Sequence, residues 1–182
     1  PQYLFLSRQS EPFAHVAARW ALIGGFNLME GEQPERVPGF RVTQSFFEVL
    51  GIQPALGRGF LPEEDVPGGP RVVVLGHELW QRRFGGSPSV LGRSISLGGE
   101  PYTVVGVAPK GFRYPGAAQL WIAMQLDPPS TEDTHIIHVL GRLKPRIQPE
   151  QLSPLLAAQS AQLRASRADV VSAHHQLGAR GP

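Results

Sequence analysis

Hydrophobic and polar residues alternate along two neighbouring segments in the middle of the chain. The segments are residues 93–97 and 101–107, and the pair Gly98-Gly99 separates them. An alternation with a period of two is typical of a strand that buries one face. Two glycines between such strands suit a tight two-residue turn. The pattern therefore predicts a β-hairpin over residues 93–107.

Further strands are predicted where apolar residues run together between turn residues. These segments are residues 36–41, residues 71–75 with their three consecutive valines, residues 120–124 and residues 135–143. Residues 3–23 predict a mixture of short helix and strand that leads into a turn at Gly24-Gly25.

Two segments have the spacing of a helix with one apolar face. Thr43 is a suitable N-cap for a helix through Leu50, and Gly51 can supply the left-handed residue that ends it. Residues 77–84 carry apolar side chains on one side and charged ones on the other, and Gly85-Gly86 follows them.

Two further helical starts are marked by proline. Ser87 and Pro88 fit the N-cap and the first position of a short turn through Leu91. A last helix is expected to begin at Pro149 or at Ser153-Pro154. Helices and strands thus mix without a regular βαβ series, which favours the α+β class.

The same pattern predicts which residues hold the fold together. The expected core side chains are Phe46, Phe47, Leu50, Trp80, Phe84 and Trp121. The glycines expected at turns or close backbone approaches are Gly51, Gly57, Gly59, Gly85 and Gly86.

Composition narrows the class of protein. The chain has 182 residues, which suits one domain or two small subdomains around a shared core. Its 21 glycines and 18 prolines make up about a fifth of the chain, which predicts many turns but not a collagen-like or disordered segment. The absence of cysteine excludes disulfides, thiolate zinc sites and cysteine nucleophiles.

The charge pattern argues against nucleic-acid binding. The formal net charge is only +2, and 15 of the 17 basic residues are arginine. The first 70 residues carry a net charge of −3 and the remainder +5. No block of five like charges and no basic stripe with interleaved aromatic residues occurs, so the electrostatic footprint of a nucleic-acid-binding surface is missing.

The ends of the sequence are expected to be those of an excised piece of a longer protein. It begins at Pro1, without the charged and apolar regions of a signal peptide. The longest apolar stretch, residues 16–28, is interrupted by Arg19 and is shorter than the roughly 18 apolar residues that a membrane span requires.

The strongest catalytic candidate is the sequence His77-Glu78-Leu-Trp-Gln81. A helical H-E-x-x-H motif would place two imidazoles one turn apart to bind zinc, with the glutamate as a base. Here the second ligand is a glutamine, so a hydrolase that uses His77 and Glu78 is kept only as a hypothesis.

Other catalytic and metal patterns are weaker. His135 and His138 would point to opposite faces of a strand, and His174-His175 lies in a polar tail. The run Glu63, Glu64 and Asp65 lacks the ligand spacing of a calcium loop and predicts a solvated acidic turn.

Neither acyl-transfer nor phosphate-binding motifs are complete. The glycine-serine stretches at residues 85–89 and 92–96 lack the last glycine of G-x-S-x-G, and no G-x-x-x-x-G-K-[ST] motif occurs. The residues alone therefore predict no catalytic residue, no cofactor-binding residue and no metal ligand.

A series of motifs in fixed order resembles a known family. The motifs are residues 41–60 (RVTQSFFEVLGIQPALGRGF), 62–65 (PEED), 71–86 (RVVVLGHELWQRRFGG), 90–93 (VLGR), 99–109 (GEPYTVVGVAP), 111–115 (GFRYP), 120–122 (LWI) and 139–145 (VLGRLKP). They are similar to the MacB-like periplasmic core domain of FtsX-like ABC transporter permeases, above all to the orphan permeases common in Acidobacteria. The resemblance covers roughly Tyr3 to Leu163.

The resemblance implies a fold and a function. The expected fold is a porter-like mixed α/β subdomain with a smaller β-rich inserted subdomain. Residues 1–182 would form one such domain, incomplete at both ends and without its flanking transmembrane helices. It would lie on the periplasmic face of the bacterial inner membrane and transmit ATP-driven conformational change for export or efflux.

The resemblance also implies partners. A separate ATPase subunit would hydrolyse ATP, so this chain would not be an enzyme, and the permease would form a homodimer or pseudo-dimer, with a possible periplasmic adaptor. The alternative to this function is a free-standing periplasmic module that binds a ligand or another protein. A signal peptide upstream and no membrane helix downstream would favour that alternative.

Overall fold

The structure is a computed structural model, and it describes residues 12–21, 23–30, 34–126 and 137–148. Its strands are β1 (Phe13–Trp20), β2 (Gly24–Leu28), β3 (Glu35–Val42), β4 (Leu56–Gly57), β5 (Val72–Leu75), β6 (Ser94–Leu97), β7 (Glu100–Val107), β8 (Leu120–Ala123) and β9 (Ile137–Leu143). Its helices are α2 (Phe46–Leu50), α3 (His77–Phe84) and the 3₁₀ turns η1 (Pro62–Glu64) and η2 (Pro88–Val90).

Six strands close into a ring, which we call the barrel. The hydrogen-bonded order is β2-β6-β7-β5-β8-β3, and an additional pairing of β2 with β3 joins the two ends. Most neighbours are antiparallel, while β3 with β8 and β5 with β7 are parallel. The contact between β2 and β6 is short and centres on Leu28 and Leu97, with the Met29 amide donating to the Ser96 carbonyl.

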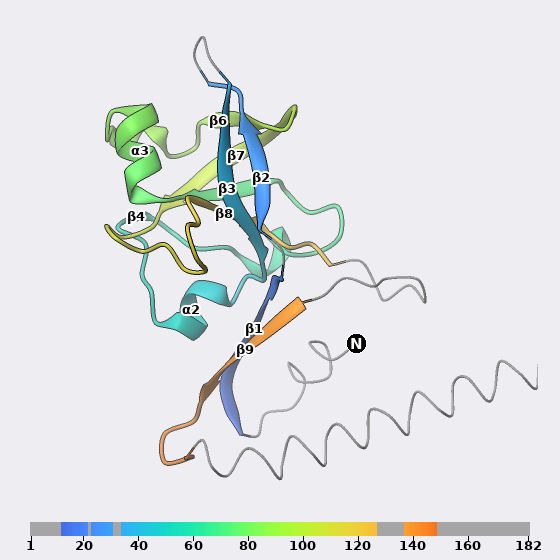
Figure 1. The fold of residues 1–182 in the computed structure, drawn as a ribbon. Helices are drawn as coiled ribbons and strands as arrows, with labels where there is room; N and C mark the ends of the chain where they lie inside the picture. Colours follow the sequence, from blue (N-terminus) through green and yellow to red (C-terminus); the bar gives the residue numbers. More distant parts are fainter. Residues whose placement is uncertain (1–11, 22, 31–33, 127–136, 149–182) are drawn as a thin grey trace, which may run out of the picture.

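The strands β1 and β9 form a two-stranded antiparallel ribbon, which we call the arm. Their register runs from Phe13 opposite Leu143 to Trp20 opposite Ile137. The arm joins the sheet where Arg19 of β1 pairs with Val42 at the end of β3. In Figure 1 the arm extends away from the barrel, below α2.

Two separate cores follow from the alternation of side chains along the strands. Leu120 and Ile122 of β8 point into the barrel, whereas Trp121 and Ala123 between and after them point to the side of the sheet that α2 covers. The barrel core includes Leu28, Val37, Val73, Leu75, Leu79, Ile95, Leu97, Val104 and Val107. The outer core includes Ala17, Phe40, Val42, Phe46, Phe47, Phe60, Val72, Val74 and Trp121.

Most predicted elements are confirmed. The helix at residues 77–84, the hairpin of β6 and β7 and the strands β3, β5 and β8 lie where the pattern placed them. Gly98 and Gly99 both have positive φ angles, of 63° and 88°, as a turn between two directly connected strands requires. The short turn after Ser87 forms too, and its hydroxyl accepts from the Ser89 amide.

Among the predicted core side chains, Phe46, Phe47 and Trp121 are buried. Leu50, Trp80 and Phe84 are only partly buried against the two cores. Among the predicted glycines, Gly51, Gly57, Gly85 and Gly86 have positive φ, whereas Gly59 packs near the Phe47 ring.

Two local predictions are wrong. Gly24-Gly25 is not a turn but the start of β2, where it pairs with residues 38–39 and where a Cβ on Gly25 would collide with the Arg36 guanidinium. The N-cap position of α2 is Ser45 and not Thr43, and the Ser45 side chain makes no capping hydrogen bond, because the hydroxyls of both residues are bound to the main chain of β1. The strand prediction at residues 135–143 holds from Ile137, and the helix predicted after Pro149 lies outside the described residues.

The fold class is therefore α+β, with a mixed and mostly β architecture and only two short α-helices in the described part of the chain. Neither of these two helices has the length and apolar character of a membrane span.

Candidate functional site

The catalytic candidates His77 and Glu78 begin α3 but do not form a hydrolytic site. The His77 ring packs edge-on against Trp80, with 5.5 Å between the ring centroids. Glu78 accepts a hydrogen bond from the Gly111 amide at 3.2 Å, and bonds from its own amide and from that of Gly111 lower its pKa. A lowered pKa makes a carboxylate a weaker base, so the geometry gives no support to the hydrolase hypothesis.

The histidines do not assemble into a metal site within the described ranges. His138 lies on β9, where its Nδ1 is 3.0 Å from an Arg19 guanidinium nitrogen. His135 and the pair His174-His175 are outside the described residues. No group of three or more histidine, aspartate or glutamate side chains comes together among the residues that the structure describes.

The acidic turn is not solvated as predicted, and this is a correction to the sequence analysis. Only Glu63 is exposed, while the Glu64 side chain is 6% exposed and forms a bidentate pair with Arg58 at 2.6 and 2.8 Å. Burial would raise the pKa of Glu64, but hydrogen bonds from Arg58 and from the Leu61 amide outweigh it and lower that pKa. Glu64 is therefore a structural carboxylate that fixes the loop.

Asp65 joins three parts of the chain. Its two carboxylate oxygens accept from the backbone amides of Gln44 at 2.8 Å and Gln125 at 2.9 Å. Burial raises the pKa of Asp65, and the two amides oppose that shift. The Gln125 side chain donates in turn to the carbonyls of Glu64, Gly69 and Pro70. Asp65 thus holds the segment before α2 against the end of β8.

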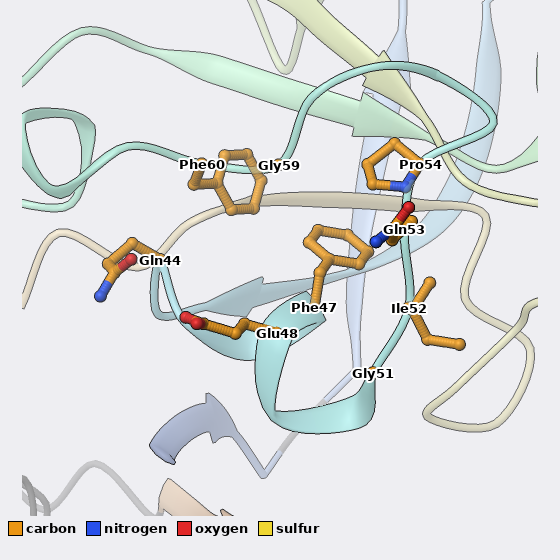
Figure 2. Close-up of a pocket in the computed structure, with 9 residues that line it drawn as sticks. All are labelled: Gln44, Phe47, Glu48, Gly51, Ile52, Gln53, Pro54, Gly59 and Phe60. Carbon is orange, nitrogen blue, oxygen red and sulfur yellow. The ribbon is translucent and has the colours of Figure 1, made fainter. Parts of the chain in front are cut away.

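A groove with both apolar and polar walls lies beside α2 and has a volume of about 360 Å³. Its lining residues are Gln44, Phe47, Glu48, Gly51, Ile52, Gln53, Pro54, Gly59 and Phe60. Figure 2 shows Phe47 rising from α2 toward Pro54 and Phe60 on the opposite side. The rings of Phe47 and Phe60 lie 5.9 Å apart and form an apolar floor.

A set of hydrogen bonds, which we call the α2 clamp, ties the arm to α2 and to the turn before it. The Thr43 hydroxyl accepts from the Ala18 amide at 2.8 Å and donates to the Ala18 carbonyl at 3.3 Å. The Ser45 hydroxyl donates to the Val16 carbonyl at 2.6 Å. From the second strand of the arm, Arg142 Nε donates to the carbonyl of Val49 at 2.8 Å.

A surface contact between His15 and Glu48 adds to the clamp. His15 Nδ1 lies 3.3 Å from a carboxylate oxygen of Glu48, and both side chains are well exposed. Exposed pairs of this kind contribute little, so the buried hydroxyls of Thr43 and Ser45 and the Arg142 bond carry most of the attachment.

Comparisons with known proteins agree with this architecture. The family model of the MacB-like periplasmic core domain matches residues 2–159. The periplasmic region of MacB from Actinobacillus actinomycetemcomitans has 18% sequence identity and a TM-score of 0.70, and the match covers 90% of this chain and 72% of that one. No curated protein sequence matches the chain.

Two further solved structures share the fold. The extracellular domain of the noncanonic ABC-type transporter YknZ from Gram-positive bacteria has 17% identity and a TM-score of 0.54, with 68% of this chain and 61% of that chain covered. A domain of a protein described as a permease from Porphyromonas gingivalis has 16% identity and a TM-score of 0.61, with 85% and 73% covered.

The fold is thus that of a β-rich α+β domain, and no catalytic constellation forms among its described residues. The chain belongs to the family of MacB-like periplasmic core domains, which are parts of ABC transporter permeases. This confirms the resemblance drawn from the ordered motifs.

Neither the residues of the α2 clamp nor the contacts of Asp65 with Gln44 and Gln125 could be predicted from the sequence. Thr43, Asp65 and Gln125 act through backbone groups far away in the sequence, so no local spacing reveals them.

Proposed function

We propose that this domain transmits ATP-driven conformational change across the membrane as part of a permease that serves export or efflux. The observation that carries the proposal is the position of the two ends of the arm. Phe13 at the start of β1 lies opposite Leu143 at the end of β9, and the Lys144 amide donates to the Pro12 carbonyl. The start of β1 and the end of β9 therefore lie side by side at the same end of one ribbon.

That placement suits a domain inserted between two membrane helices. A movement of the two helices would reach both strands of the arm together, and the arm is tied to the barrel through β3 and through α2. A paired ribbon bends less easily than a single extended segment, so it can pass displacement on to the barrel. Family membership supports the same function.

The remaining features of the proposal follow from the family. The domain would lie on the periplasmic face of the bacterial inner membrane, with residues 1–182 forming one domain that combines a porter-like subdomain with a smaller β-rich one. ATP hydrolysis would occur on a separate subunit, and the permease would act as a homodimer or pseudo-dimer, with a periplasmic adaptor as a further possible partner. We assign it no catalytic, cofactor-binding or metal-binding residue.

The first test is the coding sequence on both sides of this segment. We expect a stretch of about 20 apolar residues upstream and at least one downstream. A cleavable signal upstream together with a stop codon soon after Pro182 would overturn the proposal in favour of a free-standing periplasmic binding module.

The second test uses the full-length permease and its ATPase subunit in membrane vesicles. Replacing residues 24–126 by a short Gly-Ser linker removes the barrel and α2 but keeps both strands of the arm. We expect ATP hydrolysis to continue while transport is lost. Transport at the unaltered rate would show that the domain does not transmit the conformational change.

A further inference from the structure

The two walls of the groove beside α2 belong to different parts of the molecule. One wall is α2 with the residues next to it, including Phe47 and Gly51. The other wall is residues 53–60, which we call the strap. The strap is fixed to the barrel, because β4 pairs with β7 and because the amides of Ala55 and Arg58 donate to carbonyls of β7 at 2.8 and 3.0 Å.

The α2 wall packs on the outer core, where the Phe47 ring lies 5.7 Å from that of Trp121, but its hydrogen bonds to other elements run to the arm. The hydroxyls of Thr43 and Ser45 bind the main chain of β1 just before α2, and Arg142 of β9 binds the Val49 carbonyl within it. The Arg142 guanidinium also lies against Gly51, where an added Cβ would be 2.6 Å from one of its nitrogens. Both strands of the arm therefore hold α2, at both of its ends.

The arm has a separate attachment to the barrel that can serve as a pivot. Arg19 pairs with Val42 of β3, and the Arg19 guanidinium lies 5.4 Å from the centre of the Phe40 ring. Arg41 lies 5.3 Å from the centre of the Trp20 ring. These contacts are at one end of β1, whereas the contacts to α2 begin at Ala18 and continue toward the other end.

A rotation of the arm about this pivot would move α2 relative to the strap. A rotation of the arm about Arg19 and Trp20 displaces residues 15–18, and the α2 clamp passes the displacement to α2. The strap does not follow, since its hydrogen bonds are to β7. Two contacts resist the movement and would return α2 to its resting position: the bond from the Gln44 amide to Asp65, and the packing of Phe47 against Trp121 and Phe60.

We propose that the groove beside α2 is mechanically coupled to the arm, so that a change in the angle of the arm changes the width of the groove. The inference rests on the proposed function only for the origin of the movement, which would be the permease. The coupling itself is a property of this chain and can be measured on it.

The absence of cysteine in the 182 residues allows labels to be placed without removing any native thiol. Spin labels at Ala14→Cys on the arm and Ser94→Cys on the barrel report the angle of the arm through the distance between them. An environment-sensitive fluorophore at Gln53→Cys reports the groove. All three positions are exposed.

Two clamp variants separate the arm from α2. Thr43→Val keeps the branched shape of the side chain but removes both hydrogen bonds to Ala18, and Arg142→Met keeps the stem but removes the donor to Val49. The matched controls are Thr103→Val, at an exposed position of β7, and Arg71→Met, which breaks the exposed pair with Glu100 on the barrel.

We expect the clamp variants to increase the population with a displaced arm about tenfold, as the loss of one or two hydrogen bonds predicts. The distance distribution between residues 14 and 94 would widen, and the fluorescence at residue 53 would change with it. The controls would leave both signals unchanged. If Thr43→Val does not fold, Arg142→Met decides alone, because Arg142 lies at the surface.

Two results would overturn the coupling. In the first, the distance distribution widens while the signal at residue 53 stays that of the unaltered chain. In the second, both variants leave the distribution narrow, which would mean that the α2 clamp does not set the angle of the arm.

A last experiment distinguishes a failure of this inference from a failure of the proposed function. In the full-length permease with its ATPase, Thr43→Val with Arg142→Met is compared with the replacement of residues 24–126. If the replacement abolishes transport and the double variant transports normally, the coupling is unimportant and the proposed function stands. If the replacement also transports normally, the proposed function fails.

Discussion

The arm has strands of eight and seven residues and most barrel strands have only four or five, yet only the barrel encloses a core. All residues of β5 and β8 are buried, whereas no residue of β9 is fully buried. Each barrel strand is paired on both sides, since the ring closes through β2 and β3. Within the described residues, β9 pairs with β1 alone.

The closed barrel and the open arm owe their stability to different contacts. Closure gives every barrel strand its hydrogen bonds and an apolar face to bury, so the barrel needs little from outside it. The arm buries only part of each strand and depends on the outer core and on the α2 clamp. We therefore expect the barrel to be rigid and the arm to be the region that can move as a unit.

The largest effects are expected from two adjacent residues of β8 that face different cores. Trp121→Ala removes an indole that is buried in the outer core, where its ring centre is 5.1 Å from that of Phe112. Leu120→Ala opens a cavity in the barrel core. We expect losses of about 3–5 kcal/mol for Trp121→Ala and about 2–5 kcal/mol for Leu120→Ala in the free energy of unfolding, measured with urea.

The same two variants also test whether the arm opens separately from the barrel. Because the outer core lies between the arm and the barrel, Trp121→Ala should also loosen β1, which shows as faster exchange of its amide hydrogens relative to those of β7. Leu120→Ala should raise exchange in both strands by a similar factor. If both variants raise the exchange of β1 and β7 by the same factor, the domain unfolds as one cooperative unit.

The next largest effect concerns the unaltered chain. Amides of β9 should exchange through local opening, and those of β5 and β8 only through global unfolding, with a difference in protection on the order of a hundredfold. Hydrogen exchange followed by mass spectrometry measures both sets at once. Protection of β9 equal to that of β5 would show that the arm is as stable as the barrel.

A smaller loss of stability is expected when the pair of Arg58 and Glu64, which fixes the loop after the strap, is broken. Glu64→Gln keeps the shape but removes the charge that Arg58 binds, and it should cost about 1.5–3 kcal/mol, the range for hydrogen bonds to charged groups. The pKa of Glu64 is lowered from 4.5 in the folded chain. The contribution of the Glu64 charge to the free energy of unfolding is therefore complete above pH 4.5 and is lost as the pH falls through the pKa of the folded chain.

The contribution of Asp65 to stability changes with pH in the opposite direction. Its pKa is raised from 3.8, so its contribution is complete below pH 3.8 and is lost as the pH rises through the folded pKa. Urea unfolding of the unaltered chain and of Glu64→Gln over this pH range keeps Asp65 the same in both. The difference between the two should shrink toward acid, and a difference independent of pH would contradict the role of the Glu64 charge.

The smallest effects separate an attachment of the arm from a surface pair of the barrel. Arg142→Met removes the hydrogen bond to Val49 and should cost about 0.5–1.5 kcal/mol. Arg71→Met breaks a pair whose two side chains are both more than half exposed, and it should cost about 0–1 kcal/mol, less at high salt. Thermal unfolding at low and high salt distinguishes the two variants. Only for the Arg71 variant should the difference in stability from the unaltered chain disappear at high salt.

Much of the barrel could be predicted from the sequence because its signals are local. The hairpin of β6 and β7 needs only two alternating segments and the pair Gly98-Gly99 between them. The helix α3 likewise begins and ends at residues whose neighbours in the sequence explain it, with Gly85 as its left-handed C-cap at a φ of 61°.

The predictions that failed were those in which a residue serves a distant part of the chain. Gly24-Gly25 has the composition of a turn, but it forms a strand because its missing side chains admit the Arg36 guanidinium and the backbone of β3. The acidic run was predicted to be solvated, but Arg58 and two backbone amides bury most of its charge inside the fold.

Local periodicity, turn residues and the order of the motifs were enough to predict most of the local elements, the α+β class and the family. The closure of the barrel, the bonds of Thr43 to β1 and the position of the groove between α2 and the strap became visible only in the folded chain. The reason is physical: periodicity and turn residues act between neighbours in the chain, whereas closure and the α2 clamp depend on hydrogen bonds between groups that come together only after the chain has folded.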